Sequence, residues 1–321
     1  MHIAPLQIVP IALACVAVLA PCPTSGQTPA ASQDAAAVRI LSDTRTAIGN
    51  GVSEMRTLVI TGRTRQVRGD NLVPIEFEIQ AELPDKFARR DEFPAQDAGP
   101  AVTGFNGSRF VQSPVLQPPP ARPGGPPPPG PEQLEAAARQ QLLTAKQEFT
   151  RLMLGLFAQS YSSFPLSFAY AGQAEAPQGK AEVIDVKGDG GFAARLFIDG
   201  RTHLPIMLSW QASRPAARGR GPGSGAVPPG AAAAPPAAAP PGGGAAPQAP
   251  AEATGSPRAG GPPVPPPVEN RLYFAEHRDF SGLQLPTRVR RAVAGETTEE
   301  TTFDRFRINA RVDPRRFESG N

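Results

Sequence analysis

The chain has 321 residues, of which 40 are proline and 32 are glycine, well above the usage of ordinary globular proteins. Most of the prolines, 26 of the 40, lie in two stretches, 114–131 and 211–268. Without these stretches and an apolar N-terminal segment, roughly 218 residues of ordinary composition remain, which is enough for one sizeable core. Collagen is excluded because there is no Gly-X-Y repeat, and a mostly disordered chain is excluded by the apolar segments described below.

The formal net charge of +3 comes from the segment 211–268, which holds four arginines and one glutamate. The rest of the chain is therefore neutral. A nucleic-acid-binding domain concentrates its basic residues on a folded face, whereas these arginines lie in a proline-rich tract. We expect no nucleic-acid partner.

An apolar run extends from Ile8 to Ala20 and is followed by small residues at Thr24–Gly26. The run is too short to span a bilayer comfortably, but it suits the apolar region of a secretory signal. The sequence therefore predicts a signal peptide over 1–27 and a disordered tail over 28–33. An N-terminal membrane anchor is the alternative.

Both cysteines, Cys15 and Cys22, lie in this leader, and Cys22 follows Pro21 rather than the small residue that a lipoprotein signal requires. The mature chain would then have no cysteine, which excludes disulfides, thiolate catalysis and zinc–thiolate sites. No later segment approaches 18 consecutive apolar residues, so we expect no membrane span after leader removal. We therefore expect an exported protein.

A first helix is predicted over 34–55, where Asp34 can cap the start. Gly49 and Gly51 weaken this helix and can mark its end. Its apolar residues recur at helical steps and form one stripe: Val38, Leu41, Ile48, Val52 and Met55.

Residues 74–83 alternate strictly between apolar and polar side chains, which is typical of an antiparallel strand with one wet face. Asn106-Gly107 is a strong hairpin signal. Further strands are predicted over 57–67, 85–93, 101–105, 108–113, 167–175, 180–187, 191–199, 203–212, 270–279, 284–293 and 298–309.

The longest predicted helix covers 131–159, with Pro131 in its first turn. Its apolar residues repeat at steps of three and four, so that they form a stripe able to lie across a sheet: Leu134, Ala138, Leu142, Ala145, Phe149, Leu152 and Leu156.

These elements predict an α+β fold, a single strongly curved antiparallel half-barrel of about 11–12 strands with helices on its concave face. The half-barrel domain would cover 34–318. Its interruptions, the proline-rich loops 114–130 and 211–268, cannot bury enough apolar surface to offset their ordering entropy, so we expect them to be disordered.

Residues with catalytic chemistry are scarce in the mature chain. It has two histidines, His203 and His277, with no Gly-x-Ser-x-Gly motif and no histidine pair at metal-binding spacing. The glycine-rich runs lack the Lys-Ser/Thr of a phosphate loop. We therefore expect no enzyme, metal or cofactor, and a hydrolase that uses one of these histidines is the last-ranked alternative.

The strand faces carry many aromatic and branched side chains that must avoid water. Most such residues simply pack in a core, but part of this face can line a cavity for an acyl chain. The candidate ligand-binding residues are Ile75, Phe77, Ile79, Leu196, Ile198, Ile206, Leu208, Trp210, Phe274 and Phe306.

Several short sequence segments resemble those of the LolA/LolB-type outer-membrane lipoprotein carriers, a superfamily that includes RseB-like relatives. The similar segments lie within 34–212 and 269–318. They are LPDKFAR at 83–89, FNGSRF at 105–110 with Pro114 following, FID at 197–199 with THLP at 202–205, DFSGLQLP at 279–286, and INARVDPRRF at 308–317.

The resemblance implies a periplasmic, non-enzymatic carrier whose hydrophobic cavity holds a lipid or a lipoprotein acyl chain. An RseB-like envelope sensor, which would use the Pro/Ala/Gly-rich loop as a tether to an envelope protein partner, is the alternative. Turn and strand signatures of this kind indicate fold more directly than function.

Overall fold

A computed structural model describes residues 34–69, 71–94, 99–114, 129–176, 179–212 and 266–318. These residues belong to one compact unit, Gln33–Asn321. The predicted signal peptide 1–27 and tail 28–33 lie outside the described residues. The predicted disorder of the two proline-rich loops falls mostly outside them as well, at 115–128 and 213–265.

Twelve strands form one antiparallel sheet, and all twelve were predicted to within three residues of their ends. The strands of the N-terminal part are β1 (Thr57–Arg68), β2 (Asn71–Glu82), β3 (Lys86–Glu92), β4 (Ala101–Asn106) and β5 (Arg109–Ser113). The later strands are β6 (Leu166–Ala176), β7 (Gly179–Gly188), β8 (Phe192–Asp199), β9 (Pro205–Ala212), β10 (Val268–Phe280), β11 (Leu283–Val293) and β12 (Glu296–Ile308).

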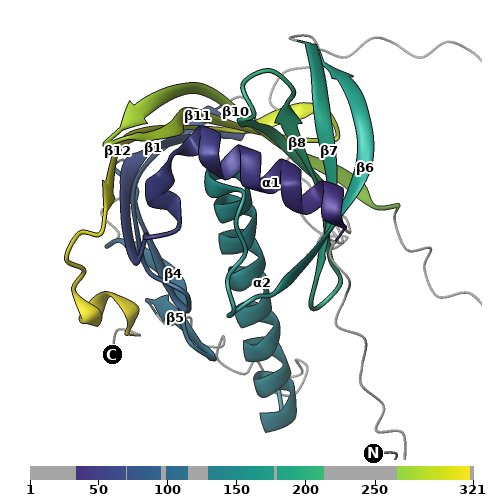
Figure 1. Ribbon diagram of the computed structural model, residues 1–321. Helices are drawn as coiled ribbons and strands as arrows, with labels where there is room; N and C mark the ends of the chain where they lie inside the picture. The colour runs from purple at the N-terminus through teal and green to yellow at the C-terminus, as the bar shows by residue number, and fades with distance from the viewer. Residues whose placement is uncertain are drawn as a thin grey trace, which may run out of the picture. The chain divides into compact units, whose positions relative to one another are not determined.

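The strand order is β5-β4-β3-β2-β1-β12-β11-β10-β9-β8-β7-β6, so every neighbour but one is also next in sequence. The exception is the pairing of β1 with β12, which joins the two halves of the chain. Strands β5 and β6 are the two edges, and the sheet stays open. Figure 1 shows this sheet curving around two helices, which confirms the predicted α+β half-barrel.

The loop predicted over 211–268 lies between β9 and β10. Gln211 and Ala212 still belong to β9, and Val268 begins β10 opposite Ala212. The first two residues and the last residue of the predicted loop are therefore paired strand residues. Each is held by backbone hydrogen bonding between the two strands.

Helix α1 (Ala35–Ile48) begins as predicted, with Asp34 as its N-cap. The Asp34 carboxylate accepts hydrogen bonds from the backbone N–H groups of Tyr170 and Ala36 at 3.0 and 2.9 Å, and these bonds lower its pKa. One N-cap side chain thus also ties the start of α1 to β6.

The prediction that this helix continues to Met55 is wrong. It ends at Ile48, because Gly49 has a φ of 138° and a Cβ there would lie 2.3 Å from the carbonyl oxygen of Gly282. A short 3-10 helix, η1 (Asn50–Val52), follows. The buried face also differs from the predicted stripe, since Val38 is 40% exposed.

Helix α2 (Pro131–Phe157) starts at Pro131 as predicted and ends two residues early, where Ala158 takes the left-handed conformation. Its apolar stripe does not cross the sheet along its whole length. Residues 131–141 are exposed, including Leu134 at 52%. The helix is about 40 Å long, and its N-terminal part extends beyond β5 (Figure 1).

The core lies between the concave face of the sheet and the two helices (Figure 1). Helix α2 packs against β4, β5, β8 and β9, while α1 packs against β6 and β11. A short 3-10 helix, η2 (Pro314–Phe317), follows β12, and its Phe317 is fully buried. Neither of the described helices has the length and apolar composition that crossing a membrane requires.

Candidate ligand cavity

A cavity of about 500 Å³ lies between α2 and the concave face of the sheet. Its walls come from α2 on one side and from β1–β5 and β10–β12 on the other. The pairing of β1 with β12 creates it, because that pairing places strands from both halves of the chain around one space.

The inner wall of the cavity is apolar. Two of its nine apolar side chains come from α2, Ala145 and Leu152. The other seven come from the sheet: Ile79, Phe87, Phe110, Leu272, Phe274, Val289 and Phe303. Most of these are less than 9% exposed, and ring contacts such as Phe87 against Phe149, at 4.9 Å between centroids, hold the aromatic ones in place. The wall is therefore preformed.

The outer part of the cavity is polar and lies nearer solvent. The exposed residues Gln140, Gln141, Thr144 and Glu148 of α2 line it, and Thr103 of β4 lies across from them. The helical repeat brings the α2 residues to one face, with the apolar Ala145 and Leu152 further along that face. The cavity thus runs from a polar mouth to an apolar interior.

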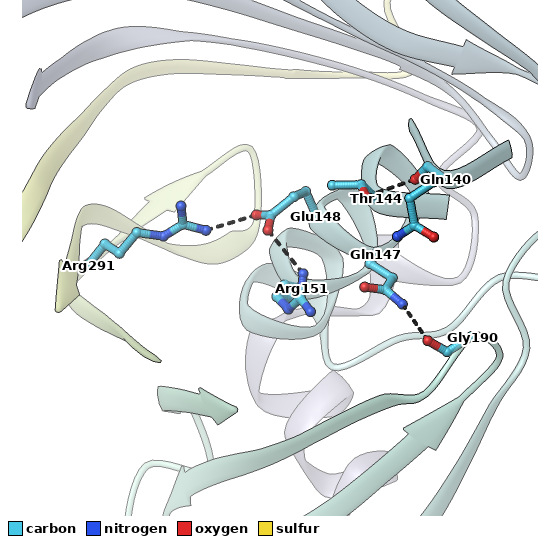
Figure 2. Close-up of polar contacts among 7 residues, drawn as sticks. All are labelled: Gln140, Thr144, Gln147, Glu148, Arg151, Gly190 and Arg291. Atoms are coloured by element: carbon cyan, nitrogen blue, oxygen red, sulfur yellow. Dashed lines mark hydrogen bonds and ion pairs between the residues drawn. The ribbon is translucent and has the colours of Figure 1, made fainter. Parts of the chain in front are cut away.

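One carboxylate joins α2 to the sheet at this mouth. Glu148 accepts hydrogen bonds from Arg291 of β11 at 2.8 Å and from Arg151, one helical turn further along α2, at 3.0 Å. Figure 2 shows Glu148 between the two guanidinium groups. The same view shows Gln147, which donates to the carbonyl oxygen of Gly190 in the turn between β7 and β8; the two atoms are 3.3 Å apart.

Arg151 is the most buried of these charged side chains, at 9% exposure. Its guanidinium lies over the rings of Trp210 and Phe192, at 4.7 and 5.2 Å from their centroids. Burial lowers its pKa, which the negative charge of Glu148 partly offsets, and the group stays protonated. Glu148 therefore holds a buried positive charge in place.

The structure brings only part of the predicted ligand set together. Ile79 and Phe274 line the cavity. Six others belong to the packed core without lining the cavity: Phe77, Leu196, Ile198, Leu208, Trp210 and Phe306. Ile75 is buried at 3% exposure but lies toward a separate hollow beside Arg63 and Arg65.

Ile206, also a candidate ligand-binding residue, lies outside the cavity. A β-bulge shifts the β8–β9 register, so that Phe197 faces Met207 but Ile198 faces Pro205. Ile206 is the extra residue, and it lines a hollow with Met207 and Phe197. A one-residue shift of this kind moves a side chain to the other face of a sheet.

Sequence reasoning missed most of the cavity wall. Ala145 and Leu152 were in the predicted helical stripe, and Phe87 and Phe303 lie in predicted strands, so their periodicity was visible. The sequence did not show that these segments meet, because that contact depends on the order of the strands in the sheet. The polar mouth, with Gln140, Gln141 and Glu148, carried no signal that separates it from an ordinary wet helix face.

The hollow that includes Ile206 measures about 880 Å³ and is strongly charged. Four arginines and four carboxylates line it, and pairs such as Arg288–Glu276, at 3.2 Å, run through it. His277 lies there, while His203 lies in the β8–β9 turn with a φ of 57°. The described residues hold no cluster of three or more potential metal ligands.

No protein-family model matches this chain, and no curated protein matches it. Solved structures similar to it include a LolA superfamily protein from Nitrosomonas europaea, with 9% identity and a TM-score of 0.46 over 87% of this chain and 96% of that one. A domain named as an outer membrane lipoprotein-sorting protein, from Vibrio parahaemolyticus, has 8% identity and a TM-score of 0.42 over 86% and 94%.

A DUF1329 family protein from Desulfovibrio piger has 8% identity and a TM-score of 0.43, with 88% of this chain and 97% of that chain covered.

Proposed function

We propose that this protein is an exported, non-enzymatic periplasmic carrier that binds a lipid or a lipoprotein acyl chain in the cavity between α2 and the sheet. The observation that supports this is the group of nine apolar side chains that forms the inner wall of this cavity of about 500 Å³, which twenty residues line in all. That volume is typical of small-molecule sites, which are mostly apolar and largely preformed.

The energetics of such a wall favour a hydrocarbon chain. Each methylene group that leaves water contributes about 0.8 kcal/mol to binding. The aromatic wall residues, such as Phe274 at 4% exposure and Phe303 at 4%, are already packed, so the protein orders few groups when the ligand enters. In comparison, eight charged groups line the 880 Å³ hollow, against five in the 500 Å³ cavity.

Ligand recovery and displacement test the proposal. The mature protein is purified without detergent and extracted, and bound lipid is identified by mass spectrometry. In parallel, the uncharged fluorophore N-phenyl-naphthylamine is titrated into the delipidated protein and displaced with a fatty acid. We expect recovered lipid, saturable fluorescence and displacement.

A matched pair of variants on α2 locates the site. Ala145→Phe places a ring into the cavity, and Ala137→Phe places the same ring on the exposed part of the same helix. We expect Ala145→Phe to reduce fluorophore binding at least tenfold and Ala137→Phe to leave it unchanged. Failure to recover any lipid together with no saturable fluorophore binding would overturn the proposal, as would equal loss in both variants.

A further inference from the structure

The charged groups at the cavity mouth already have partners within the protein. Arg89 pairs with Asp91 at 2.8 Å, and Glu148 is shared by Arg291 and Arg151. The remaining carboxylate is Glu299, which stands opposite Arg291 in the β11–β12 register. Arg151 lies behind the lining, so the lining itself holds two arginines and three carboxylates, and Glu299 accepts a hydrogen bond from the Thr301 hydroxyl at 3.2 Å.

These existing pairs disfavour a charged ligand group at the mouth. An anion that approached Arg291 would compete with Glu148, which also holds the buried Arg151. A cation that approached Asp91 would compete with Arg89 in the same way. In either case one existing partner would lose its counter-charge, which offsets the gain from the new pair.

Uncharged hydrogen-bonding groups remain available at the same place. Within the described part of the chain, the side-chain amides of Gln140 and Gln141 have no hydrogen-bond partner, and both line the cavity from α2. The Thr144 hydroxyl donates to the carbonyl oxygen of Gln140 at 2.8 Å and keeps acceptor capacity (Figure 2). An amide offers both donors and an acceptor, which complements a hydroxyl group.

We propose that the ligand is an amphiphile with an uncharged, hydroxyl-bearing head group, held at the mouth by Gln140 and Gln141 while its chain lies along the apolar wall. This inference depends on the proposed function, because it assumes that a chain occupies the cavity. The order of the lining residues sets the orientation, with the amides at the exposed end and Phe274 and Phe303 in the buried interior.

Three ligands with the same chain and different heads test the inference: monopalmitoylglycerol, palmitate and hexadecyltrimethylammonium. Each displaces N-phenyl-naphthylamine from the delipidated protein, below its micellar concentration. We expect monopalmitoylglycerol to bind at least tenfold more tightly than either charged ligand. If palmitate or the ammonium ligand binds as tightly, the head-group inference is wrong while chain binding stands. If none of the three displaces the fluorophore, the proposed function itself fails.

A variant set separates the head-group contact from the chain contact. The double variant Gln140→Ala/Gln141→Ala should weaken monopalmitoylglycerol at least tenfold, since each lost neutral hydrogen bond costs about fivefold. Fluorophore binding should not change, because alanine is well accepted in an exposed helix. Gln133→Ala, on the same helix but away from the cavity, is the control. Unchanged monopalmitoylglycerol affinity in the double variant would refute the assigned head-group site.

Discussion

Gly155 of α2 lies against the ring of Phe274 on β10, and this contact gives a direct test of the cavity. A Cβ at Gly155 would lie 1.9 Å from Cζ of Phe274 and 2.3 Å from Cε1. Carbon atoms in contact are normally about 3.5–4.0 Å apart, so in Gly155→Ala the ring must move by roughly 2 Å. Phe274 lines both the cavity and the 880 Å³ hollow, and we expect the ring to move into the cavity, because eight charged groups line the hollow.

The expected change in stability is small for such a severe overlap. Overpacking costs about 1–3 kcal/mol, and replacement of glycine by alanine inside a helix returns about 1 kcal/mol. The free energy of unfolding should therefore fall by about 0–2 kcal/mol. The displaced ring should remove room for about two methylene groups of ligand, which corresponds to roughly tenfold weaker binding of a long-chain ligand.

Urea unfolding and titration with N-phenyl-naphthylamine and monopalmitoylglycerol measure the two effects. Gly99→Ala is the control, because a Cβ there meets nothing within 4 Å. A loss of stability well above 3 kcal/mol would mean that the ring has nowhere to move, and so that the cavity is not usable space. Full stability with unchanged affinity would contradict the placement of the ligand beside Phe274.

Three further predictions concern the core, one histidine, and the ion-pair cluster of Glu148, Arg151 and Arg291. Leu196→Ala should lower the free energy of unfolding by about 2–5 kcal/mol, because Leu196 is fully buried, whereas Arg195→Ala on the opposite face should change it by under about 1 kcal/mol in urea unfolding. Burial lowers the pKa of His277, so as the pH falls this histidine is protonated in the unfolded state before it is protonated in the folded state. The free energy of unfolding should therefore be highest above about pH 6.5 and should decrease below it. In His277→Gln, but not in His203→Asn, the urea midpoint should fall less between about pH 7.5 and about pH 5.5. Glu148→Gln should cost about 1–3 kcal/mol in the same assay, because it removes the counter-charge of a buried arginine, and an unchanged midpoint would show that the cluster does not hold α2 in place.

Much of the architecture could be predicted from local sequence. Strict alternation over 74–83 and the Asn106-Gly107 turn predicted strands that the structure contains. Asp34 and Pro131 predicted where both helices begin. These signals work because the period of a strand or helix and the chemistry of a cap depend on residues only a few positions apart.

The extent of burial along each helix was less predictable. Val38 and Leu134 fit the apolar stripes, yet 40% and 52% of their surfaces are exposed. A helical period indicates that residues share a face, but the neighbouring strands decide how much of that face is covered. The same limit applied to Ile206, since an alternating pattern does not show where a bulge interrupts it.

The sequence alone determined that this protein forms a curved antiparallel sheet with two amphipathic helices. The alternation of apolar and polar residues, the helical repeat of apolar residues and the turn residues all act over short distances along the chain. Only the tertiary structure decided that β1 pairs with β12 and that α2 crosses the resulting concave face. The cavity exists because of those two contacts, which bring Ile79, Ala145, Phe274 and Phe303 from four separate segments around one space. Contacts between distant segments are set by packing and register, which no local pattern encodes.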